Sequence, residues 1–336
     1  MIKEAIGTLV QGINLTEDEM ISCMMEIMEG MATDAQIGAF LTALRLKGET
    51  IDEITAAAKV MRLKAVKINA PQNVLDTCGT GGDLAHTFNI STTTAIVLAA
   101  CGVPIAKHGN RSVSSRSGSA DVLEALRVKI DLSPDKVERC LFDTGFGFMF
   151  APMFHPAMKY AVNPRREISI RTIFNILGPL TNPAGARRQI LGVYSDSLTE
   201  PLARVLGNLG AEDAMVCHGQ DGLDEITVTD GTKVSRYYGG KVENMLLYPE
   251  DFGFTRGQLK DIQGGDKDEN AQLTMEILGG GMDNRRNIVV MNAAAGLMVS
   301  DMNIHIEDAV NKVQECIDSG RAMEKLKEIQ KVSNAL

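Results

Sequence analysis

Polar and apolar residues follow a helical spacing through roughly the first 65 residues of the chain. Three stretches there start with threonine and carry Glu or Gln three positions later: "TEDE" (16–19), "TDAQ" (33–36) and "TIDE" (50–53). This arrangement is the capping box of a helix N-terminus. Each box precedes apolar residues at helical spacing, namely Met20, Met24, Ile27, Met28, Ile37, Phe40, Leu41, Leu44, Ile54, Ala57, Ala58 and Met61. We therefore expect a small all-helical unit.

From Pro71 the pattern changes to short apolar stretches that alternate with helical ones. The helical stretches include 91–101 and 199–210, and the expected strands are 74–78, 103–108, 190–195, 213–219, 226–230 and 287–295. Such a βαβ alternation is typical of a parallel sheet with helices on its faces. The predicted fold class is α/β, with a small all-helical domain and a larger α/β domain whose central sheet is mainly parallel and flanked by helices.

The segment 155–183 is again helical in pattern, although it lies within the α/β part of the chain. We expect it to pack with the N-terminal helices rather than with the sheet. The predicted domains are a helical domain of residues 1–70, joined by helices from about 155–183, and an α/β domain of residues 71–154 and 184–336. A chain of 336 residues is long enough for two domains.

Composition excludes several classes of protein. The net charge is −9 and only 4% of residues are aromatic, which argues against a nucleic-acid partner. The six cysteines form no CxxC pair or Cys/His cluster, so neither zinc nor a disulfide framework is indicated. The longest mainly apolar run, 95–106, is far shorter than the ~20 residues of a membrane span. The start of the chain lacks the apolar core of a signal peptide, and we expect a cytoplasmic protein.

Two loops near the first expected strand have the composition of anion-binding loops. "DTCGTGGD" (76–83) follows that strand directly, and its glycines would let the backbone approach a phosphate. "TFNIST" (87–92) leads into an apolar helix, where free backbone amides and the helix dipole favour an anion. Taken singly, the first would also suit an ordinary turn and the second an ordinary helix cap.

A third polar loop, "KHGNRSVSSRSGS" (107–119), lies between an expected strand and an expected helix. It concentrates lysine, arginine, asparagine and serine without any acid. Ligands of open α/β sheets bind at the carboxyl ends of the strands, so three such loops at one edge indicate a ligand with more than one phosphate.

A fourth loop, "HGQDGLDEIT" (218–227), carries the adjacent acids Asp224 and Glu225 after another expected strand. Adjacent acids are common on protein surfaces. However, a small number of carboxylates next to phosphate-binding loops is typical of a Mg²⁺ site. The four loops together predict a Mg²⁺-assisted site for a phosphate ester or pyrophosphate. No Ser-His-Asp or Cys-His constellation is present, and His108 is a candidate either for a general base or for a positioning role.

Five motifs, taken together and in this order, resemble the anthranilate phosphoribosyltransferase family. They are "GTGGD", "NIST", "KHGNRSVSS", "NPRREISIRTIFNILGPLTNPA" and "DGLDE", and the resemblance continues through "GGDKDENA" and "NAAAGL". It covers nearly the whole chain. The resemblance implies a cytoplasmic homodimer whose active site lies in the cleft between a helical and an α/β domain. Members join anthranilate to 5-phosphoribosyl 1-pyrophosphate (PRPP) and release pyrophosphate, in tryptophan biosynthesis.

The resemblance also implies the site residues. PRPP-contacting positions are Gly79, Gly82, Asp83, Thr87, Asn89, Ile90, Ser91, Thr92, Lys107, His108, Gly109, Asn110, Arg111, Ser112, Val113, Ser114, Ser115 and Ser119. Anthranilate positions are Gly79, Asn110 and Arg165. Ser91, Asp224 and Glu225 fall at the positions that hold two Mg²⁺ ions. PRPP and anthranilate would be the only partners besides a second copy of the chain, with no nucleic acid and no membrane.

Chemistry agrees with these assignments. Mg²⁺ would neutralise the departing pyrophosphate, and an arylamine is already neutral at pH 7, so a strong general base is not required. Arg165 offers a planar fork for the anthranilate carboxylate. One departure concerns the glycine-rich loop, where the family usually has glycine after the aspartate and this chain reads "GGDLAHTF", with Leu84 and His86. We expect it to affect the mobility of the loop rather than activity.

Two other classes of protein fit parts of this sequence but have different functions. The pyrimidine nucleoside phosphorylases share the two-domain architecture, and "SGSADVLEAL" (117–126) also fits their pattern. They need no paired metal carboxylates, so "DGLDE" and "KHGNR" count against them. A non-catalytic, nucleic-acid-binding relative is disfavoured by the net charge of −9.

Overall fold

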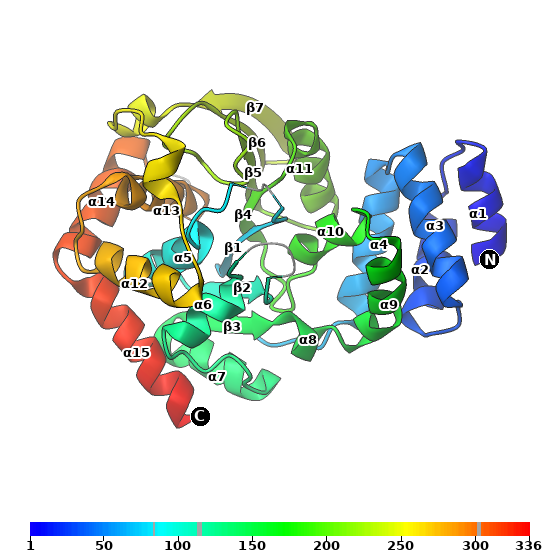
Figure 1. The fold of residues 1–336 in the computed structure, drawn as a ribbon, viewed down its shortest axis with the longest axis horizontal. Coiled ribbons are helices and arrows are strands. Elements are labelled where there is room, and N and C mark those ends of the chain that lie inside the picture. The colour runs from blue at the N-terminus through cyan, green and yellow to red at the C-terminus, as the bar shows by residue number, and fades with distance from the viewer. Residues whose placement is uncertain (83–84, 113–115, 301–303) are drawn as a thin grey trace.

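A helical bundle stands beside a larger α/β region in the computed structural model, which describes residues 1–82, 85–112, 116–300 and 304–336 (Figure 1). This is the fold class expected from the sequence. The bundle begins with four helices, α1 (Ile2–Val10), α2 (Glu17–Met28), α3 (Asp34–Lys47) and α4 (Ile51–Lys64).

All three predicted capping boxes are present. Thr16, Thr33 and Thr50 each accept the third backbone N–H of their helix, and the Glu or Gln at that position accepts the N–H of the threonine in return. The twelve apolar positions predicted from helical spacing are all buried. The bundle therefore forms where local sequence signals place it.

The segment of residues 151–180 returns to the bundle. It contains α8 (Ala151–Phe154), the short 3₁₀ turn η1 (Pro156–Met158), α9 (Lys159–Ile168), α10 (Phe174–Leu177) and η2 (Gly178–Leu180). Helix α9 packs on α2 and α3, and α10 packs on α4. As a result, α9 and α10, which are far from the first four helices in the sequence, form part of the helical end seen at the right of Figure 1.

One sheet of seven strands runs through the α/β region in the order β3-β2-β1-β4-β5-β6-β7. The first five strands in this order are parallel, and β6 and β7 are antiparallel. The mainly parallel sheet is thus confirmed. The strands are β1 (Leu75–Gly79), β2 (Ile105–Gly109), β3 (Phe146–Phe150), β4 (Arg188–Gly192), β5 (Asp213–Gly219), β6 (Thr232–Tyr238) and β7 (Lys241–Leu247).

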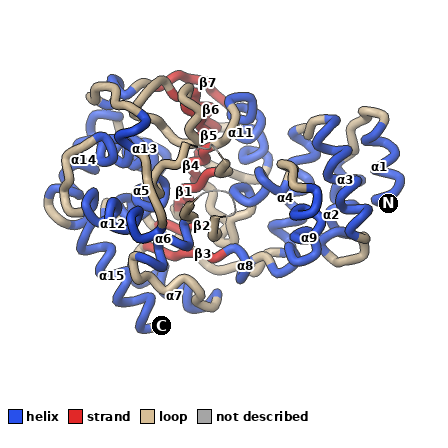
Figure 2. The backbone as a smooth tube through the Cα atoms, in the orientation of Figure 1, coloured by secondary structure: helices blue, strands red, loops and turns tan. Residues whose placement is uncertain are grey.

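Helices cover both faces of this sheet (Figure 2). Helices α5 (Ile90–Ala100) and α13 (Asn284–Ser300) pack on one face, and α11 (Thr199–Asn208) packs on the other, where it also meets α4. The remaining elements are α6 (Ser119–Ala125), α7 (Pro134–Thr144), η3 (Asp196–Leu198), η4 (Pro249–Phe252), η5 (Leu259–Ile262), α12 (Lys267–Leu278), α14 (Ile306–Asp318) and α15 (Arg321–Ala335). Among all described residues, no helix is both long and apolar enough to cross a lipid bilayer.

The predicted strand 287–295 is wrong, because these residues lie inside α13. This helix is buried on nearly every side between the sheet and neighbouring helices, so it lacks the polar stripe that identifies a surface helix. A short apolar run without such a stripe is equally consistent with a buried strand.

The predicted strand 226–230 is also wrong. Side chains, rather than a neighbouring strand, form several of the hydrogen bonds to its backbone N–H and C=O groups. Asn292 accepts the N–H of Ile226 and donates to its carbonyl, and Thr232 Oγ1 accepts the N–H of Thr227. Strands β3, β6 and β7 were not predicted. The turn between β6 and β7 is formed by Gly239 and Gly240, both with positive φ, as a tight hairpin requires.

The order of the strands reverses beside β1. From β1 the chain proceeds outward to β2 and β3, and it then returns to place β4 and β5 on the other side of β1. In open α/β sheets, ligands bind at the carboxyl ends of the strands at this switch point. The candidate loops after β1, β2 and β5 can therefore meet at a single edge.

Candidate active site

The glycine-rich loop leaves β1 at Gly79 and is fastened to the end of β4. The N–H of Thr80 donates to the Gly192 carbonyl (2.9 Å), and the N–H of Tyr194 donates to Thr80 Oγ1 (3.0 Å). Gly81 and Gly82 follow with φ values of 67° and 80°, a region that favours glycine. The loop therefore turns sharply over the switch point between β1 and β4.

The loop after β5 that carries Asp224 and Glu225 (residues 218–227, the acidic loop) lies across the same switch point, and two glycines leave space for it. Gly79 and Gly192 are register partners in β1 and β4. A Cβ on Gly192 would lie 1.5 Å from the Asp224 carbonyl oxygen, and one on Gly79 would lie 2.5 Å from Asp224 Oδ2. That carboxylate oxygen accepts the N–H of Gly81 at 2.8 Å. The glycine-rich loop and the acidic loop are thus in direct contact.

Lys107 brings a positive charge beneath these loops. Its side chain is 1% exposed, and its Nζ donates to the Thr77 carbonyl and, at 3.3 Å, to Ser91 Oγ. Burial lowers the pKa of Lys107, whereas Asp76 and Glu225 oppose that shift by charge. The lysine thereby joins β1 to the start of α5, and it lies close enough to Glu225 of the acidic loop for the two charges to interact.

The first turn of α5 is open to an anion. Asn89 occupies the N-cap position, but its side chain makes no capping bond. Its Nδ2 instead donates to the Ser117 carbonyl (3.1 Å), and its Oδ1 accepts from Asn270 Nδ2 (3.0 Å) and from Ser117 Oγ (3.2 Å). Asn89 therefore connects the start of α5 with the loop after β2 and with α12, while the first amides of the helix stay without a side-chain cap. The buried Thr92 Oγ1 has no partner among the described residues.

The loop after β2 is closed by the helix that follows it. Arg111 pairs with Asp121 (2.8 Å) and Glu124 (2.9 Å) of α6, and the N–H groups of Ser112 (3.1 Å) and Gly118 (2.9 Å) donate to Asp121 Oδ2. The charge of Arg111, a predicted PRPP position, is therefore compensated within its own loop.

The base of the same loop also packs tightly. Ser119 Oγ donates to the Asn110 carbonyl (3.3 Å), and a Cβ on Gly109 would lie 2.1 Å from Ser119 Oγ. Gly109, Asn110 and Ser119, all predicted site residues, are thus brought together.

His108 points into the protein, next to a histidine that sequence reasoning missed. Its Nδ1 lies 3.3 Å from the Gly178 carbonyl, and its ring centroid is 4.9 Å from that of His155. Burial lowers the pKa of His108 to about 3 and that of His155 to about 4. Nε2 of each ring has no partner among the described residues. Both imidazoles are therefore neutral at pH 7.

Arg165 lies on α9, half-buried, with its guanidinium 5.2 Å from the centre of the Phe174 ring. Burial lowers its pKa. Within the described ranges, no carboxylate pairs with it, and no hydrogen bond joins its guanidinium to the other predicted site residues. A half-buried cation of this kind is suited to an anionic ligand.

Arg171 is a second arginine that meets the site, and sequence reasoning missed it. Its Nη2 donates to the Gly82 carbonyl, and its guanidinium lies 4.3 Å from the centre of the Tyr194 ring. It belongs to the motif "IRTIFN", but nothing in the sequence shows that this arginine touches a loop 89 residues earlier.

Four predicted site residues, Asp83, Val113, Ser114 and Ser115, lie outside the described residues, as does Leu84. His86, the other departure from the family pattern, has a φ of 54°, a left-handed conformation that is uncommon for a side-chain-bearing residue. Its carbonyl accepts the N–H of Gly264. Thr87 bridges Gln263 next to it. His86 and Thr87 are thus held against the 263–264 segment, and the effect of Leu84 and His86 on the mobility of the loop stays a prediction.

The donor set at the acidic loop fits Mg²⁺ that is shared with a substrate. Within the described part of the chain, no group of three or more His, Cys, Asp or Glu side chains could hold a metal ion. Ser91, Asp224 and Glu225 offer one hydroxyl and two carboxylates. Mg²⁺ typically takes one or two protein carboxylates and completes its shell with water and substrate phosphates.

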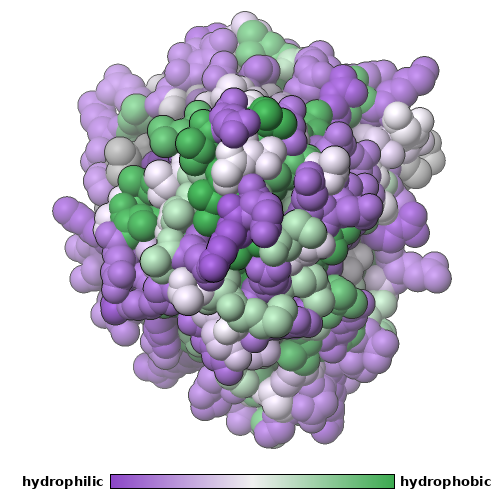
Figure 3. Space-filling view, turned by 90° about the vertical axis from the view of Figure 1, so that its right-hand side faces the viewer, coloured by the Kyte–Doolittle hydropathy of each residue, from purple (hydrophilic) through white to green (hydrophobic). Residues whose placement is uncertain are grey.

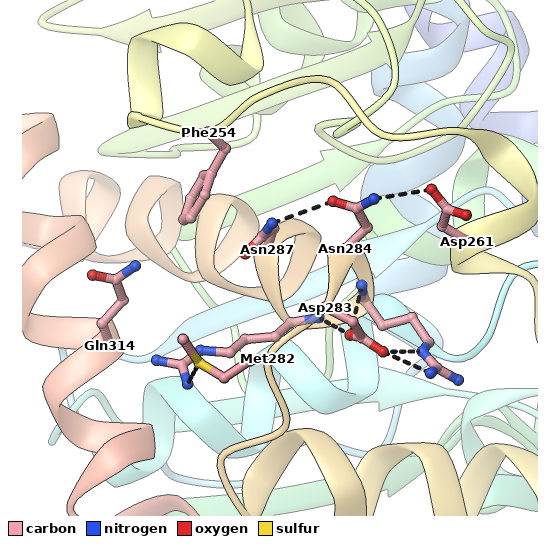
Figure 4. Close-up of a pocket in the computed structure, with 9 residues that line it drawn as sticks. Phe254, Asp261, Met282, Asp283, Asn284, Asn287 and Gln314 are labelled. Atoms are coloured by element: carbon pink, nitrogen blue, oxygen red, sulfur yellow. Dashed lines mark hydrogen bonds and ion pairs between the residues drawn. The ribbon is translucent and has the colours of Figure 1, made fainter.

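A separate hollow of about 610 Å³ lies at the start of α13, between α14 and the 254–261 segment (Figure 4). Its polar groups bind one another. Asn284 donates to Asp261, Arg285 pairs with Asp283, and Arg286 pairs with Asp318. None of the predicted site residues lines this hollow.

Comparison with known proteins identifies the family. Residues 71–323 match the glycosyl transferase family a/b domain, and residues 3–65 match the helical bundle domain of that family. The anthranilate phosphoribosyltransferase of Acetivibrio thermocellus is 55% identical over 336 residues, which are 100% of this chain and 97% of the relative.

Solved structures agree with this match. The anthranilate phosphoribosyltransferase of Thermus thermophilus is 38% identical with a TM-score of 0.93, covering 98% of this chain and 99% of its own. That of Saccharomyces cerevisiae, solved with PRPP and Mg, is 27% identical with a TM-score of 0.91, covering 100% and 98%. The chain belongs to the anthranilate phosphoribosyltransferase family.

Proposed function

We propose that this chain transfers the 5-phosphoribosyl group of PRPP to the amine of anthranilate and releases pyrophosphate, the second step from chorismate to tryptophan. The observation that carries the proposal is the contact of the glycine-rich loop with Asp224 over the β1–β4 switch point, beside the uncapped start of α5. This arrangement suits a substrate with several phosphates and a metal ion. No observation favours a nucleoside phosphorylase or a nucleic-acid-binding protein.

PRPP would occupy the edge formed by the loops after β1 and β2. Among the described residues, the backbone amides of Gly82 and of the first turn of α5 are the main donors for its phosphates, because the amides of Thr80 and Gly81 already bind Gly192 and Asp224. Lys107 would act from beneath as a fixed positive charge, because its own Nζ already holds Ser91 and β1. We keep the remaining predicted PRPP positions as proposals.

Two Mg²⁺ ions would be held by Ser91, Asp224 and Glu225 together with the substrate phosphates. They would neutralise the negative charge that grows on the leaving pyrophosphate. Lys107 holds Ser91, and the Gly81 amide holds Asp224, so these two proposed ligands are placed before the substrate arrives. Such preorganisation is the main contribution a protein makes to charge stabilisation.

Anthranilate would bind with its carboxylate at Arg165, and Gly79 and Asn110 would border its ring. The half-buried guanidinium has no carboxylate partner among the described residues, so a bound carboxylate would supply one. The Phe174 ring holds the guanidinium plane from one side. An arginine held in this way presents two parallel N–H groups, a geometry that lysine cannot reproduce.

The chain would work mainly by positioning. The amine nitrogen attacks C1′ while the bond from C1′ to the pyrophosphate oxygen breaks, and the nitrogen then loses a proton to water or to pyrophosphate. With a pKa of about 3, His108 is too weak a base to take that proton efficiently at pH 7. We infer that His108 positions neighbouring groups instead. Holding the two reacting atoms in line supplies the rest of the rate enhancement.

The domain division also remains a proposal. Residues 1–70 with 155–183 would form the helical domain, and residues 71–154 with 184–336 the α/β domain. The packing of α9 on α2 and α3 supports this assignment, as do the separate matches for the helical and α/β parts. The cleft between the domains would then lie between Arg165 and the sheet edge.

We propose that the protein is a homodimer joined through its helical end. A groove of about 570 Å³ runs between α1, α3 and α9, and the exposed Val10 (72%) and Leu46 (83%) lie along it. Figure 3 looks onto this end, where apolar patches interrupt the polar surface. Sedimentation should give twice the chain mass of 36.3 kDa, and Leu46→Glu should shift it toward the monomer. A monomer at micromolar concentration would contradict the proposal. The cytoplasmic location stays a prediction.

A fluorescence time course of anthranilate with the protein, PRPP and Mg²⁺ tests the proposed reaction. We expect the anthranilate signal to fall only when PRPP and Mg²⁺ are both present, and EDTA to stop the change. A signal that stays constant while PRPP still binds would move the acceptor to another amine and overturn the assignment.

A further inference from the structure

Arg171 joins two parts of the site that are distant in sequence. It lies between α9 and α10, in the segment that also carries Arg165. Its Nη2 donates to the Gly82 carbonyl in the glycine-rich loop, and its guanidinium stacks on the Tyr194 ring after β4, at 4.3 Å from the ring centre. Among the described residues, no carboxylate pairs with Arg171. In the part of the chain that the structure describes, its charge is therefore met by a carbonyl dipole and an aromatic face.

Gly82 is suited to this contact in two ways. Its φ of 80° lies in the left-handed region, which strains other residues. A Cβ at this position would lie 2.9 Å from Arg171 Nη2, closer than such atoms approach. The backbone conformation therefore favours glycine where the arginine meets the loop, and a larger residue there would push the guanidinium aside.

The contacts of Arg171 close a ring around the glycine-rich turn. Tyr194 donates its backbone N–H to Thr80 Oγ1 at the start of the turn, and its ring carries the guanidinium that holds Gly82 two residues later. Tyr194 and Arg171 thereby fix both ends of the turn. The amide of Gly81, between these ends, faces Asp224.

We propose that Arg171 is a positioning residue for PRPP. It holds the turn in shape at Gly82, and it places beside the phosphates a positive charge that no carboxylate of the described residues compensates. This inference rests on the proposed function, because it assigns PRPP to that loop. Since Arg165 lies on the same segment, the segment that carries the proposed anthranilate contact also shapes the PRPP loop.

The proposal predicts a selective effect of Arg171→Gln. Loss of a charged hydrogen bond and of one charge should raise the KM for PRPP roughly 10- to 100-fold. The KM for anthranilate should rise by less than about threefold, because Arg165 is intact. Arg171→Lys keeps the charge but cannot both stack as a plane and reach Gly82, so it should recover only part of the loss.

A matched control is available on the neighbouring helix. Arg166 is exposed and donates to Asn163 on its own helix. Arg166→Gln removes the same charge from nearly the same place without touching the loop, and it should leave both KM values unchanged. Tyr194→Phe keeps the aromatic face and should keep the loop protected, whereas Tyr194→Leu removes that face.

Hydrogen–deuterium exchange of the unliganded protein, with KM values for both substrates, tests the proposal. We expect faster exchange of the 79–82 amides in Arg171→Gln and Tyr194→Leu than in wild type, Arg166→Gln and Tyr194→Phe, with a selective rise in the KM for PRPP. Unchanged exchange in Arg171→Gln, or equal rises in both KM values, would overturn it. A wild type without phosphoribosyl transfer would refute the proposed function, while the exchange comparison would still decide whether Arg171 holds the loop.

Discussion

The loops that follow β1 and β2 lie side by side at the sheet edge, but different parts of the chain hold them in place. The first is held by Asp224, Arg171 and Tyr194, which bond to loop residues 143, 89 and 114 positions away. The second is held by Asp121 and Glu124 of the next helix, whose partners lie no more than 13 positions away.

This difference indicates distinct roles for the two loops. In its described residues, the loop after β2 takes most of its contacts from α6, and two bonds between Ser117 and Asn89 connect it to the start of α5. The loop after β1 takes its shape only when the acidic loop and the α9–α10 segment are in place. Its geometry therefore depends on the segments that would hold Mg²⁺ and anthranilate, which makes it the loop through which the two substrates can influence each other.

The largest effect should come from removing the acids that meet the first loop. Asp224→Asn with Glu225→Gln should lower Mg²⁺-dependent turnover by at least ~10³-fold, because the metal charge is lost from the leaving group and the Gly81 amide loses its carboxylate partner. Turnover at several Mg²⁺ concentrations checks this. Asp230 lies a few residues after Glu225 and pairs with Arg256. Asp230→Asn, which removes this acid, should retain activity. Full activity of the double variant would exclude these acids from the metal site.

Arg165→Ala should have the next largest effect, and it should fall on anthranilate. Loss of a charged hydrogen-bond donor to the carboxylate corresponds to an increase in KM of about 10- to 100-fold. PRPP binding, measured by calorimetry without anthranilate, should be nearly unchanged. An unaltered KM for anthranilate would refute the assignment of its carboxylate to this arginine.

Gly192→Ala tests whether the shape of the loop after β1 depends on the close approach of the acidic loop to the end of β4. The new Cβ would meet the Asp224 carbonyl, so the acidic loop must move, and such overpacking costs about 1–3 kcal/mol. We expect a lower Tm together with a lower kcat/KM. Gly7→Ala, at an exposed position in α1 where a Cβ meets nothing, should instead stabilise the protein by about 0.5–1 kcal/mol. A fully active Gly192→Ala enzyme would contradict the role given to this glycine.

The smallest effect concerns pH and the start of the second loop. His108 and His155 have native pKa values of about 3 and 4, below the 6.5 of an unfolded histidine. Between pH 6.5 and about 4 these two histidines therefore bind up to two more protons in the unfolded chain than in the native protein, which makes stability decrease as pH falls. Asp76, whose pKa burial raises to about 6, offsets part of this slope. The free energy of unfolding in urea, measured from pH 7 to pH 4.5, should show this slope. The slope should be shallower in His155→Asn. An equal slope would show that His155 does not contribute to the pH dependence of stability.

The two loops also differ in how well the sequence predicts them. The three capping boxes and the apolar positions of the bundle depend on residues a few places apart, and all of them form as expected. Most described contacts of the second loop are local in the same sense, apart from those between Ser117 and Asn89. The contacts of the first loop depend on Gly192, Tyr194 and Arg171, which no local pattern connects with it.

The wrong strand predictions have a related cause. The run 287–295 becomes a helix because its surroundings bury it on nearly all sides, and 226–228 needs no strand partner because Asn292 and Thr232 bind its backbone. Tertiary contacts decide both outcomes, and they are not visible in periodicity. The family motifs name most of the proposed site residues, but not the residues that hold them in place.

Hydrogen–deuterium exchange with and without Mg²⁺–PRPP tests most directly whether the loop after β1 and the acidic loop form one substrate site. We expect Mg²⁺–PRPP to slow exchange strongly at Gly81 and Gly82, around Asp224, and in the segment around Arg171, in addition to the loop after β2. Protection confined to the loop after β2 would contradict the account, because PRPP would then bind without the loop that the acids and Arg171 hold in place.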